Sequence, residues 1–365
     1  MTPTKARGQL RGHLKPKRGP GARGLEHMAR NPACERLQVL TAVGVGPNMA
    51  ANEILGERGL EGQSPFALVR GNSFERYVLA EGGARLLELY RREGRVDVAA
   101  GPFVDVRAWE PAGLDRAEQS RRRRAITARL LEGAGRQGRP AIVAHAVLGV
   151  EVAGASFDIE ADYLVADGGG FYLPGEIKSY ADKASKTDPA DLQGACRQAA
   201  VAVVALRQAR RRLGLGGGPR AACDLVLRKA GTNWPTLRAM TLEGEVDSIE
   251  RALAAAPRLL VEAAARAGGA SLGEPEVLAS IPNHYVEECR EFCALARRCK
   301  RDALAAADPA LLGDRAREQL APVSSLVRMA RFVQGDDAPA SDAERASAAR
   351  LRRVVVAYRK ALQGT

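Results

Sequence analysis

The stretch IEADYLVADGGGFYLPGEIKSY, residues 159–180, decides the fold of this chain. Its centre, Asp167-Gly168-Gly169-Gly170, is a turn signal between two apolar segments that partly alternate with polar residues. We therefore predict a β-hairpin. If the hairpin is symmetric about Gly169, Asp162 lies opposite Glu176, each seven residues from the tip. Cross-strand partners share one face of a sheet, with Cβ atoms roughly 4.5–5.5 Å apart.

Three charged residues converge on that face. Side chains alternate along a strand, so Lys178 shares the face of Glu176. Two carboxylates and an ammonium group fit a divalent-metal site with an attached base or charge stabiliser. The alternative is a solvated polar stripe on the outside of an antiparallel sheet. The apolar neighbours at 163–165 and Ile177 favour a sheet that is covered on both faces.

The composition indicates an acidic partner. The chain has 365 residues, enough for one large domain and a smaller lobe. It has 55 Lys and Arg against 43 Asp and Glu, a net charge of +12, which favours nucleic acid first and a membrane surface second. Most of the basic residues are arginine and alanine is abundant, so a GC-rich bacterial genome is an alternative source of the excess.

Nothing in the sequence indicates a membrane protein. The chain has no apolar run of about 18 residues or more, and no hydrophobic region follows the N-terminal positive charges. We therefore expect a cytoplasmic protein. Residues 1–24 hold seven Lys or Arg and no acidic residue, with many Gly and Pro, so they are expected to form a disordered basic arm.

Hydrophobic spacing along the rest of the chain predicts alternating helices and strands. A short helix containing Cys34 is expected within residues 25–44. The further elements are helices over 73–94, 115–133, 189–213 and 246–268, and strands over 141–157, 159–166, 172–180, 223–230 and 236–244. The helix over 115–133 carries the basic run 121–124, which is typical of a solvated face. This order predicts an α/β fold with a central mixed sheet flanked by helices.

The element order and the charged residues together resemble the P-D-(D/E)-x-K nuclease superfamily, whose core runs helix, three strands, helix, strand. Asp162 matches the aspartate of the second strand, and Glu176 and Lys178 match the E-x-K of the third. Glu75, in GNSFERYV, matches the acid of the first helix. The resemblance covers roughly residues 70–250.

The resemblance implies a restriction-endonuclease-like core and an organisation for the rest of the chain. The core is expected over residues 71–270, after an N-terminal segment, 25–70, that holds one cysteine. A helical cysteine-containing lobe, 271–333, and a C-terminal helix, 343–365, follow it.

The resemblance also implies roles for the site residues. Members close to RecB carry a glutamine on the helix after the E-x-K strand, often as Q-x-x-x-Y. Gln198 fits best, with Ala202 in the place of the tyrosine, and Gln193 is the second choice. The expected catalytic residues are Glu75, Asp162, Glu176, Lys178 and Gln198. Asp162, Glu176 and the backbone carbonyl of Ile177 are expected to bind Mg²⁺ or Mn²⁺.

The six cysteines lie at positions 34, 196, 223, 289, 293 and 299. Cys289 and Cys293 are four residues apart and share a helical face, whereas Cys299 lies about 240° further round, so a break or turn must bring it back. In a cytoplasmic protein, such clustering favours metal or redox chemistry over structural disulfides. Cys196 and Cys223 are expected to be small core residues.

One N-terminal cysteine and a C-terminal trio also resemble the iron–sulfur staple of RecB-like nucleases, including the AddB subunit and the CRISPR-associated adaptation exonucleases. This resemblance implies a [4Fe–4S] cluster on Cys34, Cys289, Cys293 and Cys299 that ties the chain ends together. In those families the first gap of the trio is usually two residues, and here it is three. Zn²⁺ on four thiolates is the alternative cofactor.

Together with the resemblance, these observations predict a Mg²⁺- or Mn²⁺-dependent deoxyribonuclease, a RecB-type exonuclease or endonuclease in DNA repair, recombination or antiviral defence. One alternative is a catalytically silent nucleic-acid-binding subunit of a larger complex, and another is a scaffold whose cysteines bind zinc. No G-x-x-x-x-G-K-[S/T] phosphate loop occurs, so unwinding of DNA requires a helicase or another subunit as partner. Aromatic residues make up only 4%, so we expect arginine to bind the DNA backbone without a broad stacking platform.

Overall fold

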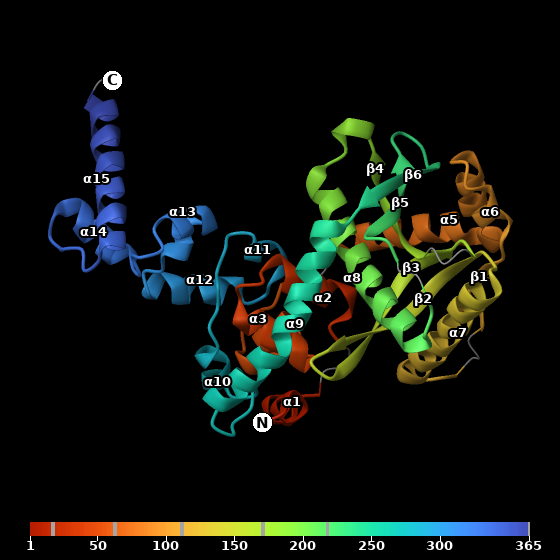
Figure 1. Ribbon diagram of the computed structural model, residues 1–365, viewed down its shortest axis with the longest axis horizontal. Helices are drawn as coiled ribbons and strands as arrows, with labels where there is room; N and C mark the ends of the chain where they lie inside the picture. Colours follow the sequence, from red (N-terminus) through yellow and green to blue (C-terminus); the bar gives the residue numbers. More distant parts are fainter. Residues whose placement is uncertain (16–18, 61–63, 110–112, 169–171, 217–218, 364–365) are drawn as a thin grey trace. The chain divides into compact units, whose positions relative to one another are not determined.

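The computed structural model describes residues 1–15, 19–60, 64–109, 113–168, 172–216 and 219–363 (Figure 1). The chain divides into two units, which we describe separately. Unit 1 comprises Met1–Pro32, Leu37–Gly46 and Glu61–Ser280, and unit 2 comprises Ala33–Arg36, Pro47–Leu60 and Ile281–Thr365.

Unit 1 is an α/β domain built on a mixed six-stranded sheet in the order β1-β2-β3-β4-β5-β6. The strands are β1 (Phe103–Asp105), β2 (Ala141–Val152), β3 (Ala155–Ala166), β4 (Tyr172–Asp182), β5 (Ala222–Lys229) and β6 (Pro235–Thr241). Strands β2, β3 and β4 form the predicted antiparallel meander. Strand β1 pairs with β2 in parallel, and β4 pairs with β5 in parallel.

The register of the β3–β4 hairpin agrees with the predicted symmetry. Tyr163 pairs with Gly175, and Ala166 pairs with Tyr172. The midpoint of both pairs is position 169, although the predicted turn residues Gly169 and Gly170 lie outside the described residues. This register places Asp162 and Glu176 at the end of the ladder away from the turn.

Helices cover both faces of the sheet, as the sequence predicted. The helical elements of unit 1 are α1 (Pro3–Arg11), α2 (Gly21–Arg30), α5 (Pro65–Arg92), α6 (Val96–Ala100), η2 (Val106–Trp109), α7 (Arg116–Gln137), η3 (Ala184–Lys186), α8 (Pro189–Leu213), α9 (Glu243–Arg266) and α10 (Pro275–Ser280). Tyr163 and Ile177 pack with α5 on one face. On the other face, Tyr172 donates a hydrogen bond to the Leu131 carbonyl of α7, and Lys178 contacts α8.

A buried polar network ties α5 to the sheet. The Tyr90 hydroxyl donates to Asp224 on β5 at 2.7 Å, and its ring meets that of Tyr163 edge to face. Arg95 forms an ion pair with the same carboxylate. Asp224 is fully buried, so these donors satisfy an acceptor that would otherwise destabilise the core.

The predicted helix over 73–94 is interrupted. Helix α5 runs from Pro65 to Arg92, but Ala80–Gly83 leave helical geometry, and Gly82 and Gly83 have φ angles of 64° and 73°. Glycine adopts positive φ without the steric cost that a Cβ atom brings. A side chain at Gly83 would also overlap the ring of Phe103, so the break brings α5 close to β1.

The prediction of a disordered arm over residues 1–24 is wrong for the described part of that segment. Helices α1 and α2 form there, and Ala6 and Leu10 of α1 are fully buried. Arg7 is buried as well, because its Nε donates to the carbonyl of Ala42 at 2.8 Å. A basic segment can therefore pack against the rest of the fold when its apolar side chains are buried and its guanidinium donors are hydrogen-bonded.

Unit 2 is helical. Its elements are α4 (Pro47–Met49), the π-helix η1 (Ala50–Ile54), α11 (Cys289–Phe292), α12 (Ala296–Ala305), η4 (Pro309–Leu312), α13 (Asp314–Gln319), α14 (Leu326–Gln334) and α15 (Asp342–Gln363). Helix α3 (Glu35–Val43) begins in unit 2 and continues into unit 1. Cys34 directly precedes α3. The prediction of a helix that contains Cys34 is therefore wrong, because this residue lies in the loop between α2 and α3.

We expect Gly175→Ala to destabilise unit 1. An alanine Cβ at this position would overlap the ring of Tyr163, its cross-strand partner, which is fully buried and cannot move into solvent. The free energy of unfolding should fall by about 2 kcal/mol, the typical cost of overpacking. Urea unfolding followed by circular dichroism measures the change.

Gly133→Ala is the matched control, because α7 leaves nothing within 4 Å of a Cβ atom there. That variant should gain about 0.5 kcal/mol from the higher helix propensity of alanine. Equal stabilities of the two variants would contradict the packing of Tyr163 on Gly175.

Candidate functional site

The charged residues predicted from the hairpin meet where β3 and β4 part. The described ladder between these strands ends at the Tyr163–Gly175 pair. Beyond it, the backbone N–H of Ile177 donates to Oδ2 of Asp162 at 2.7 Å. The carboxylate of Asp162 therefore accepts a hydrogen bond that a strand carbonyl would otherwise accept. This bond fixes Asp162 beside Glu176 and Lys178.

Lys178 joins this pair of carboxylates to α8. Its Nζ lies 2.6 Å from Oε2 of Glu176 and 3.0 Å from Oε1 of Gln198. Of the two glutamines considered, Gln198 therefore reaches the site, whereas Gln193 is exposed and does not line the cavity described below. Ala202, in the place where the resemblance would put a tyrosine, is buried in α8.

Burial controls the protonation of this group. Burial and the neighbouring charge of Asp162 raise the pKa of Glu176 to about 7, while Lys178 opposes the shift. Burial also raises the pKa of Asp162. For Lys178, burial lowers the pKa, but the charges of Glu176 and Asp162 outweigh it, and the net shift is upward. Two carboxylates this close attract a cation, and one ammonium group balances only one of them.

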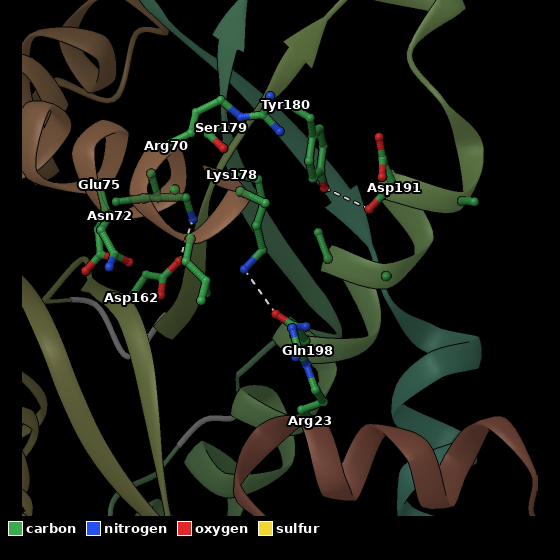
Figure 2. Close-up of a pocket in the computed structure, with 17 residues that line it drawn as sticks. Arg23, Arg70, Asn72, Glu75, Asp162, Lys178, Ser179, Tyr180, Asp191 and Gln198 are labelled. Atoms are coloured by element: carbon green, nitrogen blue, oxygen red, sulfur yellow. Dashed lines mark hydrogen bonds between the residues drawn. The ribbon is translucent and has the colours of Figure 1, made fainter. Parts of the chain in front are cut away.

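These residues border a cavity of ≈ 400 Å³ (Figure 2). Glu75, Asp162, Ile177, Lys178 and Gln198 line it, whereas Glu176 is only 6% exposed. Figure 2 shows Glu75 and Asp162 on one side and Gln198 on the other, with Lys178 between them. The structure thus brings together all of the side chains that the sequence predicted for the site.

Glu75 is held by a histidine that the sequence analysis missed. His145 Nε2 lies 2.8 Å from Oε1 of Glu75, and His145 Nδ1 lies 2.7 Å from Oδ1 of Asp105. Both partners are acceptors, so both ring nitrogens carry protons and the ring is an imidazolium. Burial lowers the pKa of His145, but the hydrogen bonds to Asp105 and Glu75 outweigh it and raise the pKa to about 9.

A local distortion of β2 accompanies the orientation of His145. Its φ is 54°, and the ladder omits the pair that it would form with Asp162, although the register is unchanged on either side, with Ala144 opposite Tyr163 and Ala146 opposite Ala161. The available signal was a single histidine in the apolar run AIVAHAVLG, which by itself resembles a buried core residue. Only the tertiary fold shows that it meets Glu75.

Other residues of the cavity were also missed. Arg23 of α2 lines it, a residue that the sequence analysis had assigned to the disordered arm. Tyr180 lines it too, and the Tyr180 hydroxyl donates to the backbone carbonyl of Asp191 at 2.8 Å. Arg70, on the first part of α5, completes the cationic rim. In Figure 2, Arg70 and Arg23 lie at opposite ends of the pocket.

The basic run on α7 is largely neutralised. Arg121 pairs with Glu118, Arg123 with Glu160, and Arg124 with Asp158. The last two acids are on β3, so these arginines attach α7 to the sheet. This part of the positive charge therefore has a structural role.

The four clustered cysteines belong to unit 2. Cys34 lies in Ala33–Arg36, and Cys289, Cys293 and Cys299 lie in the segment from Ile281 onward. Helix α11 ends at Phe292, Cys293 after it has an extended backbone, and α12 starts at Ala296. The predicted break between Cys293 and Cys299 is confirmed.

The clustered thiols influence one another's pKa values. Burial raises the pKa of Cys293 and of Cys299, and Cys34 and Cys289 add to both shifts. Arg36 donates to the sulfur of Cys299 at 3.4 Å. Cys196 and Cys223 are buried in unit 1, as expected of core residues.

Within the described ranges, no three or more His, Cys, Asp or Glu side chains are grouped so that they could hold a metal ion. The same part of the chain contains no helix that is both long enough and apolar enough to cross a membrane. Metal and cluster binding therefore remain predictions from the chemistry of the donor sets.

Comparisons with known proteins add little. No protein-family profile matches this chain, and no curated protein matches it. Among solved structures, the crystal structure of SSO0001 covers 55% of this chain and 92% of that chain, at 11% identity and a TM-score of 0.17. A TM-score this low does not define a common fold, so this similarity supports no functional inference.

His145 predicts a pH dependence of stability. Its pKa is about 9 in the folded chain against an ordinary value of 6.5, so the folded state holds the proton more tightly. The resulting stabilisation is complete below pH 6.5 and is lost as the pH rises through about 9. Thermal unfolding in EDTA at a series of pH values should show this decline in the wild type and a weaker one in His145→Gln.

The comparison variant is His13→Gln, which should show the same decline of thermal stability with rising pH as the wild type. Identical pH profiles for the wild type and His145→Gln would contradict the imidazolium assignment.

Proposed function

We propose that this chain is a Mg²⁺- or Mn²⁺-dependent nuclease of the P-D-(D/E)-x-K superfamily that hydrolyses phosphodiester bonds in DNA. The observation that carries the proposal is that Glu75, Asp162, Lys178 and Gln198 line one cavity, with Glu176 buried against Lys178. These residues come from α5, β3, β4 and α8, the elements that the superfamily uses. The mixed sheet flanked by helices supports the same assignment.

The donor set fits a hard divalent cation. Asp162 and Glu176 supply carboxylate oxygens, and the carbonyl of Ile177 would supply a third oxygen ligand. The raised pKa of Glu176 reflects crowded, poorly solvated negative charge, which a cation would relieve. When bound, the metal ion lowers the pKa of a water molecule and neutralises charge at the phosphate.

The hydrogen bonds of Lys178 define its role. An ammonium group has three donors, and Glu176 and Gln198 accept two of them. The third is available for the attacking water or a phosphate oxygen, so Lys178 acts as an oriented cation. Gln198 holds Lys178 in this position from α8. His145 holds Glu75 in the same way from β2.

Cys34, Cys289, Cys293 and Cys299 are proposed to bind a [4Fe–4S] cluster that stabilises unit 2. Four buried cysteines from two distant parts of the sequence fit either this cluster or zinc. Arg36 donates a hydrogen bond to the sulfur of Cys299. Because a guanidinium stabilises negative charge on sulfur, this contact favours thiolate character in the ligand.

Lys178→Ala should reduce metal-dependent DNA cleavage by about 10²–10³-fold, because the developing charge at phosphorus loses its fixed cation. End-labelled DNA incubated with Mn²⁺ measures the rate, with EDTA as the metal-free control. Lys186→Ala, an exposed lysine of η3, should keep the wild-type rate. Circular dichroism of both variants checks the fold.

Wild-type cleavage in a folded Lys178→Ala protein would sink the mechanism. DNA binding by the wild type without any cleavage would favour the alternative of a catalytically silent subunit.

Anaerobically purified protein should be brown, with the broad visible absorption of an iron–sulfur cluster. Cys34→Ser should lose this absorption together with stoichiometric iron, whereas Cys196→Ser, a buried cysteine of unit 1, should keep both. Metal analysis distinguishes the two cofactors. A colourless protein with one zinc per chain would contradict the iron–sulfur cluster and support zinc.

A further inference from the structure

A second cavity in unit 1 lies beside the candidate site. It has a volume of ≈ 350 Å³ and is lined by Arg70, Ser73, Phe74, Tyr77, Arg228 and Asn233. Arg70 also lines the cavity that contains Lys178. Because one side chain borders both cavities, the two cavities are neighbours on either side of Arg70.

Helix α5 presents one stripe of side chains that includes Arg70. Phe66, Arg70, Ser73 and Tyr77 are spaced by three or four residues, so they share a face of the helix. All four precede the break at Ala80–Gly83, where the helix changes direction. The stripe therefore starts near the rim of the candidate site and ends in the second cavity.

The arginines of the second cavity keep their charge available. Arg228 donates to the carbonyls of Ser179 at 3.2 Å and Thr232 at 3.1 Å, which are neutral acceptors. Within the described residues, no carboxylate forms an ion pair with Arg70 or Arg228, in contrast to Arg123 and Arg124 of α7. An unneutralised, fixed guanidinium beside a cavity attracts an anion such as a phosphate.

Aromatic rings accompany these arginines. The guanidinium of Arg85 lies 4.3 Å from the centre of the Tyr77 ring and holds it against the helix. Trp234, directly after Asn233 of the cavity, is 61% exposed, and Phe66 at the start of the stripe is 86% exposed. An exposed ring presents a flat face for stacking, and rings combined with cationic grooves are the usual partners of unpaired nucleic-acid bases.

We propose that the second cavity is a subsite for unpaired nucleotides of the strand whose phosphodiester bond lies at Lys178. Arg70 and Arg228 bind the phosphates that flank the reacting one, and Phe66 and Trp234 stack on bases. The strand is single, because bases inside a duplex are already stacked on each other and present no face to a ring. This inference rests on the proposed nuclease function and adds a binding path to it.

Binding without cleavage tests the subsite. Fluorescence anisotropy of labelled oligo-dT, with EDTA present, reports affinity with no metal-dependent reaction. Arg228→Gln and Trp234→Ala should each weaken binding by about tenfold, the typical cost of losing one phosphate or stacking contact. The matched controls Arg92→Gln, on the last turn of α5, and Trp109→Ala, with 54% exposure, should bind like the wild type.

A second readout places the base at the ring. The chain has two tryptophans, so Trp109→Phe leaves Trp234 as the sole tryptophan. Oligo-dT should quench the fluorescence of this variant, and duplex DNA of the same sequence should quench it much less.

The outcomes separate the two proposals. If Arg228→Gln and Trp234→Ala bind oligo-dT like the wild type and Trp234 is not quenched, while the wild type cleaves DNA with Mn²⁺, the subsite is wrong and the nuclease stands. If Trp234 is quenched and both variants bind weakly, but no cleavage occurs, the subsite stands and the nuclease proposal fails. Equal quenching by duplex DNA would overturn the preference for unpaired nucleotides.

Discussion

The hydrogen bond from the Ile177 N–H to the Asp162 carboxylate is the constraint on which the candidate site depends. Strand β4 serves two neighbours, pairing antiparallel with β3 near the hairpin and in parallel with β5 further along. Gly175 pairs with Tyr163 of β3 and with Asp224 of β5, and the described ladder to β3 ends at this residue. At that point a backbone donor needs an acceptor, and Asp162 provides it. The parting of the strands and the position of the carboxylate therefore have one cause.

Each further component of the site compensates for the burial of its carboxylates. Glu176 is buried beside Asp162, and an isolated pair of carboxylates there would be strongly unfavourable. Lys178 balances one charge, and Gln198 satisfies a second donor of Lys178 from α8. Across the cavity, His145 does the same for Glu75 and is itself balanced by Asp105. The result is a chain of fixed charges in which each member is oriented by its neighbour.

The sequence was sufficient for those parts of the structure that have a local signal. Alternation on both sides of the glycine run predicted the register that aligns Asp162 with Glu176, because a strand has a period of two. The spacing of Cys289, Cys293 and Cys299 likewise predicted a helix break. His145 had no such signal, since its role depends on a positive φ within β2 and on a contact with Glu75, 70 residues earlier in the chain. The charge of residues 1–24 was misleading, because burial of Arg7 depends on carbonyls that only the fold supplies.

The same reasoning changes how the positive charge of the chain is interpreted. A net charge of +12 suggested backbone contacts by arginine in general, yet the densest basic run, on α7, is paired with acids of β3 and attaches a helix to the sheet. Arg70 and Arg228, which form no ion pair with a carboxylate among the described residues, border the cavities instead. Charge that a protein neutralises internally cannot attract a ligand, so an arginine without an acidic neighbour says more about binding than a cluster does. For this chain, the electrostatic path to the site therefore runs along α5 and the end of β5.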